Sequence, residues 1–272
     1  MLAAATTSAP ITSSLPQPLQ SSVNKPIQPP LPLSKQDKQD KQNTMAQRMQ
    51  ACTTCHGAGI TAQVGRTANE AFFPRIAGKP ALYLYNQLLN FKDGRRHYGL
   101  MVGMVEHMSD AYLMEMAQYF AQLDLPYPAP TPPRPGTPPA TLARGQALAT
   151  QGDAARGLPA CTACHGAALM GVAPALANAN TLASSLPSMP ALLGLPRDYM
   201  AGQLGAWQTG QRRAQAPDCM GRIAKLLTPD DVDALATWLA AQSVPVGAAA
   251  KPAITVPGAL PSTQQWACGG AQ

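Results

Sequence analysis

The sequence predicts an all-α protein made of two similar halves, and three observations lead to this prediction. Residues 74–83 and 190–199 share a pattern at an offset of 116 residues, and identities at that offset continue as far as Arg96 and Arg212. Apolar residues recur at helical spacing after both copies. Residues 126–139 are rich in proline, which favours an extended connector between the halves.

Each half carries three helical patterns: one before the repeated segment, one starting inside it and one at the end. Thr44 and Ser109 in the first half, and Thr141 and Thr228 in the second, are suited to cap a helix N-terminus. Good helix formers or periodic apolar residues follow each of them. We therefore expect helices over residues 44–51, 82–91, 109–123, 141–150, 199–207 and 228–242.

These patterns divide the chain into five parts. Residues 1–44 are polar and rich in Pro, Ser, Thr and Gln, which predicts a disordered leader. Two folded domains should cover residues 45–125 and 140–245, joined by the linker at 126–139. Residues 246–272 should form a tail on the surface.

Charge and hydropathy exclude two classes of function. The net charge is +6, but Lys and Arg exceed Asp and Glu by only one in residues 45–125 (7 − 6) and in 140–245 (7 − 6). The folded parts are thus nearly neutral, and no base-reading motif is present, so we expect no nucleic-acid partner. No apolar run reaches the roughly 18 residues of a membrane span.

Four of the six cysteines form two copies of one motif, Cys-x-x-Cys-His. In this motif two thiols add to the vinyl groups of a haem, and the adjacent imidazole binds its iron. A zinc site would need a further pair of cysteines close together in the sequence, which the chain lacks. We therefore expect two covalently bound haem c groups, attached through Cys52, Cys55 and His56 in the first half and Cys161, Cys164 and His165 in the second.

A haem that only transfers electrons needs a second axial ligand, and a methionine thioether raises the reduction potential. Met101 lies eight residues before Ser109, and Met220 lies eight residues before Thr228. This equal spacing selects Met101 and Met220 as the ligands. Met104 stays open as the alternative in the first half.

With these motifs the chain resembles the di-haem cytochrome c4 family over about residues 45 to 242. The resemblance implies an all-α fold of two tandem cytochrome c domains joined by the proline-rich linker and related by a pseudo-two-fold axis. It also implies His/Met ligation of both irons, with the carbonyls of Pro74 and Pro190 accepting a hydrogen bond from the proximal histidines. Pro174 is a rival for the second of these roles. Tyr83 and Tyr199 could reach haem propionates, and core packing is the equal alternative.

Cys219 and Cys268 are the remaining cysteines, and we expect a disulfide between them because haem attachment of this kind takes place in the oxidising periplasm. The required signal or anchor is not recognisable near Met1.

The function that this pattern favours is the passage of single electrons between redox proteins. The donor would be a quinol-oxidising complex or a dehydrogenase, and the acceptor a terminal oxidase. Two alternatives remain: a di-haem enzyme such as a thiosulfate dehydrogenase or peroxidase, favoured by Cys219 beside Met220, and a fixed subunit of a larger oxidoreductase.

Overall fold

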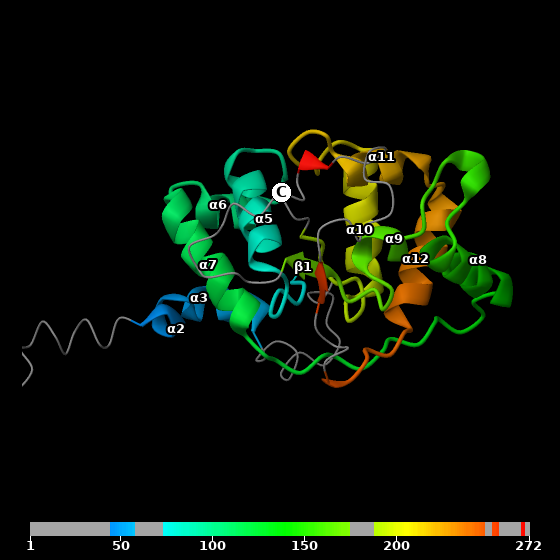
Figure 1. Cartoon of the computed structure of the whole chain (residues 1–272), viewed down its shortest axis with the longest axis horizontal. Helices are drawn as coiled ribbons and strands as arrows, with labels where there is room; N and C mark the ends of the chain where they lie inside the picture. The colour runs from blue at the N-terminus through cyan, green and yellow to red at the C-terminus, as the bar shows by residue number, and fades with distance from the viewer. Residues whose placement is uncertain (1–43, 58–72, 175–187, 248–251, 256–267, 270–272) are drawn as a thin grey trace, which may run out of the picture. The chain divides into compact units, whose positions relative to one another are not determined.

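The computed structural model describes residues 44–57, 73–174, 188–247, 252–255 and 268–269, and these residues are mostly helical, as predicted. Figure 1 labels the elements along the chain. The first half contains α2 (Met45–Arg48), α3 (Gln50–His56), α5 (Ala81–Lys92), α6 (Gly99–Val105) and α7 (Asp110–Gln122). The second contains α8 (Pro139–Thr150), the 3-10 turn η2 (Ala154–Arg156), α9 (Thr162–His165), α10 (Arg197–Gln208), α11 (Cys219–Leu226) and α12 (Pro229–Ala240).

The predicted helix N-caps are confirmed at three positions. The side chains of Thr44, Ser109 and Thr228 each accept a hydrogen bond from a backbone N–H of the first turn. The prediction for Thr141 was wrong, because α8 begins two residues earlier, with Pro138 as its N-cap. Pro139 suits the first position of the helix, because the fixed φ of proline is already helical and its missing N–H would have no intrahelical partner.

In the first half, α5 and α7 pack along each other, and α6 lies against α5 (Figure 1). Their contact is apolar, as the helical spacing of the sequence predicts. The buried residues of this cluster are Met49, Leu84, Phe91, Val105, Leu113, Met116, Ala117 and Phe120.

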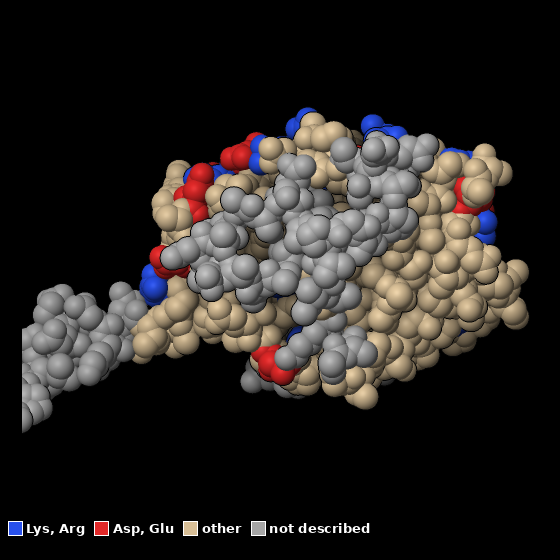
Figure 2. Space-filling model, viewed as in Figure 1, with Lys and Arg blue, Asp and Glu red and all other residues tan. Residues whose placement is uncertain are grey.

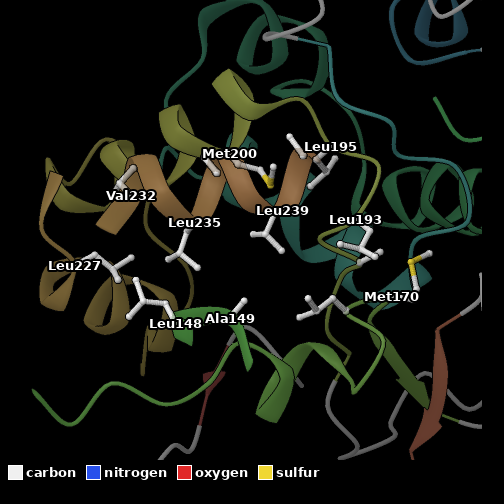
Figure 3. Packing of buried hydrophobic residues seen from close by; sticks show 14 of the residues in the cluster. Leu148, Ala149, Met170, Leu193, Leu195, Met200, Leu227, Val232, Leu235 and Leu239 are labelled. Atoms are coloured by element: carbon white, nitrogen blue, oxygen red, sulfur yellow. The ribbon is translucent and has the colours of Figure 1, made fainter. Parts of the chain in front are cut away.

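In the second half, α12 lies against α8 and α10. Figure 3 shows Leu235 and Leu239 of α12 between Leu148 of α8 and Met200 of α10. Gly145 of α8 allows the close approach, because a Cβ at this position would overlap the backbone oxygen of Ala234. The helix patterns that the sequence showed thus form the core of this half.

Several of the described elements were not expected. The segments between the predicted helices are short, and their apolar residues are too irregularly spaced to predict α6 and α11. A two-stranded parallel ladder also forms, in which β1 (Val172–Pro174) pairs with β2 (Ala253–Thr255), so part of the tail returns to the second half. The predicted leader and most of the tail lie outside the described residues.

The linker is extended as far as a turn at Pro135 and Gly136, where the Thr137 N–H donates to the Arg134 carbonyl (3.0 Å), and it touches both halves. The Thr131 N–H donates to the Ala240 carbonyl at the end of α12 (2.8 Å). Tyr127 packs on the core of the second half, while the guanidinium of Arg75 lies 4.0 Å from the centroid of its ring. The linker therefore packs against both halves.

On the face that Figure 2 shows, blue and red atoms form small separate groups, with no large field of one sign. This agrees with the nearly neutral halves predicted from the sequence. None of the described helices has the length and apolar character needed to cross a membrane.

One buried carboxylate ties three segments of the second half together. Asp231 accepts hydrogen bonds from Arg144 of α8 (2.9 Å), from Arg156 of η2 (2.7 Å) and from the Thr228 N–H at the start of its own helix (3.1 Å). Burial alone would raise the pKa of Asp231, but these three donors outweigh it and hold the pKa well below the usual range of a carboxyl group.

We predict that Asp231→Asn lowers the free energy of unfolding by about 1.5 to 3 kcal/mol, because it removes the buried anion that Arg144 and Arg156 share, while both arginines keep Asp153 as a partner (3.0 Å each). Urea unfolding of the second half at neutral pH measures this. The depressed pKa means that the contribution is present at neutral pH and is lost as the pH falls from about 5 through the carboxyl range. Exposed Asp230→Asn, one residue away, is the control and should change stability by less than about 0.5 kcal/mol. Equal effects of the two changes would contradict the prediction.

Candidate functional site

Both Cys-x-x-Cys-His motifs fold as a helical turn. The first motif ends α3 at His56, and the second runs from Cys161, the N-cap residue of α9, to His165. In such a turn the two cysteines, three residues apart, lie on the same face as the histidine that follows them. None of these four cysteines forms a disulfide, so the thiols are available for other chemistry.

Each histidine is fixed by a backbone carbonyl from a distant segment. His56 Nδ1 lies 3.0 Å from the Pro74 oxygen, and His165 Nδ1 lies 2.8 Å from the Pro190 oxygen. Because a carbonyl oxygen only accepts, Nδ1 carries the hydrogen in both rings, and Nε2 keeps its lone pair. The rival for the second role, Pro174, lies in β1.

Burial keeps these groups neutral. Desolvation is the main cause that lowers the pKa of both His56 and His165, so the imidazoles stay uncharged and able to bind a metal. Desolvation likewise raises the pKa of Cys52 and Cys164, and that of Cys161 to about 11. The motifs therefore lie in surroundings from which water is largely excluded.

Both motifs open onto one cavity of about 530 Å³, to which the two halves contribute. The sequence-predicted site residues all line it: Cys52, Cys55, His56, Pro74, Tyr83, Met101, Cys161, Cys164, His165, Pro190, Tyr199 and Met220. The rest of the described lining is mainly aliphatic and aromatic. A cavity of this kind suits a large flat apolar group held by a few polar contacts.

The two selected methionines lie on the helices that the sequence did not reveal. Met101 is in α6 and Met220 is in α11, and both line the cavity. Met104 and Met108 line it as well, and Met104 is the more exposed of the α6 methionines, with 44% of its surface accessible. Both halves thus bring several thioethers to the cavity wall: Met101, Met104, Met108 and Met116 from the first, and Met189, Met200 and Met220 from the second.

Where the halves meet, two arginines cross in a paired arrangement. Arg96 donates to Gln87 (3.0 Å) and to Gln203 (2.7 Å), while Arg212 donates to Gln203 (2.7 Å) and to Gln87 (2.9 Å). Arg96 also donates to the Tyr199 hydroxyl (3.1 Å). The sequence repeat contained both Arg and both Gln residues as identities, but we assigned them no role. Polar residues that recur at equivalent positions were the signal.

The partners of this arginine pair bear on whether the cavity fits haem. Within the described part of the chain, neither guanidinium has a carboxylate at ion-pair distance, and Arg212 is buried. Burial would raise the pKa of Tyr199, yet the two arginines outweigh it and lower the pKa. Such a cationic pair in a cavity wall calls for an anion, and the propionates of haem are carboxylates that arginine binds well. With neutral imidazoles and paired thiols, the donor set fits haem c.

The predicted disulfide between Cys219 and Cys268 is present, with Cα atoms 5.4 Å apart. It anchors the end of the tail directly beside Met220, at the start of α11, where Asp218 caps the helix by accepting from the Gly221 N–H (2.9 Å). As a disulfide sulfur, Cys219 is not a thiolate donor. The feature that favoured an enzyme with a His/Cys haem is therefore removed.

Comparison with known proteins agrees with this chemistry. Residues 142–243 match the family model described as cytochrome c. The chain is 36% identical over 192 residues to the thiosulfate dehydrogenase electron acceptor of Thiomonas intermedia (strain K12), covering 71% of this chain and 78% of that protein. It is 30% identical over 189 residues to cytochrome c4 of Pseudomonas aeruginosa, covering 69% and 82%. Reduced cytochrome c4 from Pseudomonas stutzeri has a similar structure, with a TM-score of 0.55 at 27% identity, covering 72% of this chain and 96% of that one.

The chain belongs to the cytochrome c family, and within that family to the cytochrome c4 group. The fold is that of two tandem cytochrome c domains, and the chain is an electron-carrier cytochrome like these relatives.

Proposed function

We propose that this chain is a periplasmic cytochrome with two covalently bound haems, one in each half, which accepts electrons from a thiosulfate dehydrogenase and passes them on singly. The observation that carries the proposal is the duplicated site: two Cys-x-x-Cys-His turns, each with its histidine fixed by a proline carbonyl, open onto one cavity. A haem c, when bound, supplies an iron that takes up and releases one electron.

The residues of each half then have distinct tasks. In the first half, Cys52 and Cys55 attach the haem, His56 and Met101 bind its iron, and Tyr83 faces its carboxylates. The corresponding residues of the second half are Cys161, Cys164, His165, Met220 and Tyr199. The domains that carry them are residues 45–125 and 140–245.

The carbonyls of Pro74 and Pro190 fix the orientation and the tautomer of His56 and His165. A ring held through Nδ1 can neither rotate nor exchange its tautomer without losing a buried hydrogen bond. Each imidazole would therefore keep its place whichever charge a bound iron carried. This limits reorganisation when an electron arrives or leaves, which is what a carrier requires.

The dehydrogenase is proposed as donor because the Thiomonas relative is named as the electron acceptor of that enzyme. A terminal oxidase or similar protein would receive the electron. A catalytic role in thiosulfate oxidation is not supported, since the cysteine next to Met220 is held in a disulfide.

We predict that Met101→Ala and Met220→Ala each reduce the weak near-infrared sulfur-to-iron absorption band of the oxidised protein, and that the double variant loses it. The reason is that each change removes the only thioether bound to one iron. Met116→Leu, which alters a buried methionine of the α7 core, is the control and should keep the band. A band that survives whole in Met101→Ala and falls in Met104→Ala would make Met104 the ligand.

We also predict that catalytic amounts of a thiosulfate dehydrogenase, with excess thiosulfate, reduce both haems of this protein. Thiosulfate alone should leave them oxidised, because Cys219, the cysteine next to Met220, is held in a disulfide and supplies no thiolate to the iron. The visible absorption bands of reduced haem c, followed by stopped flow, measure the reaction. Reduction by thiosulfate without the dehydrogenase would show that the chain is itself an enzyme.

A further inference from the structure

One buried position of the repeat carries a charged residue in the first half and an apolar residue in the second. Lys79 precedes α5, and the residue at the equivalent position before α10 is Leu195. Both are buried, with 8% and 9% of their surface accessible. An apolar residue at this place needs no explanation, but a lysine does, because buried lysines are rare unless their ammonium has a partner.

The partner of Lys79 lies in the other half. Its Nζ donates to the Ala191 carbonyl (3.0 Å), and Ala191 directly follows Pro190, whose own carbonyl holds His165. An amine of the first half is thus one peptide away from the contact that fixes the second histidine. Leu195 has no amine and cannot make the reciprocal contact. Only the second half therefore receives a buried lysine from the other half.

The charge of Lys79 is not neutralised locally. Among the described residues no carboxylate lies at ion-pair distance from it; the charged and titratable groups that act on it or feel its charge are Arg75, on its own segment, and His165, across the contact. Burial, with a smaller contribution from Arg75, lowers the pKa of Lys79 to about 7.

The same field acts on the second histidine. After burial, the positive charge of Lys79 is a further cause that lowers the pKa of His165. A field that disfavours a positive charge on this imidazole also disfavours the additional charge of ferric over ferrous iron bound to it. For His56 the corresponding cation is Arg96, and guanidinium groups, unlike ammonium groups, are not deprotonated in proteins.

We propose that Lys79, although it belongs to the first half, raises the reduction potential of the haem in the second half and couples electron uptake there to proton uptake. The proposal rests on the proposed function, since it requires a haem at His165. When the second iron gains an electron from the donor, a neutral Lys79 gains a proton from solvent, and it returns this proton when the electron leaves. Lys79 acts through the electric field of its charge and does not bind the iron.

The test is a spectroelectrochemical titration of the intact di-haem protein. Met101→His and Met220→His, each of which should lower one potential by replacing a thioether, assign the two potentials to their halves. In the wild type the second potential should fall as the pH rises through about one unit on either side of 7, and the first should not.

Lys79→Met keeps the length of the side chain and removes its charge. We expect the distribution of one electron between the haems to shift about tenfold toward the first, which equals about 59 mV for a one-electron couple, and the pH dependence to disappear. Lys79→Arg should keep the high potential and also lose the pH dependence. The control is Lys92→Met, because Lys92 also donates to a backbone carbonyl, that of Met108 (2.9 Å), but lies in the first half and is paired with Asp110 (2.7 Å). It should leave the second potential unchanged.

An unchanged second potential in Lys79→Met, an equal shift of both haems, or a pH dependence that persists in Lys79→Arg would each overturn the proposal. If Lys79→Met does not fold, Lys79→Arg alone decides through the pH dependence. Haem content, measured on every preparation, separates these outcomes from failure of the proposed function, in which the wild type itself would lack the second haem.

Discussion

The hydrogen bond between each motif histidine and a proline carbonyl is the constraint on which the site depends. It joins a helical turn to a segment 18 residues away in the first half and 25 in the second, and it sets which ring nitrogen is free. The surrounding apolar core excludes water, so both imidazoles stay neutral. The helices before and after the motifs position this one contact, and the cavity forms around it.

The contact between the halves is polar at its centre. Two arginines share two glutamines there, and Lys79 crosses to the second half. The two arginines have no carboxylate at ion-pair distance among the described residues, and a buried cation without an anion is costly. They become understandable if both halves hold an anionic group, so the same residues that join the halves also make the cavity suitable for two haems.

Much of this followed from the sequence because it resides in local patterns. The cysteine motifs, the repeat and the caps at Ser109 and Thr228 are each visible within a few residues. The pairing of β1 with β2 and the crossing of Arg96 with Arg212 were not predictable, because they join segments far apart in the chain. The helices α6 and α11 were missed because seven or eight residues show too little periodicity. Ligation by Met101 and Met220 stays a prediction.

The most direct test of the account is the mass of the intact protein after denaturation. Because the thioether bonds survive unfolding, the account predicts the polypeptide plus two haem masses. A variant with Cys161 and Cys164 both changed to serine should carry one haem, and so should the matched variant at Cys52 and Cys55. A wild-type mass with one haem or none would contradict the central claim that both halves bind haem.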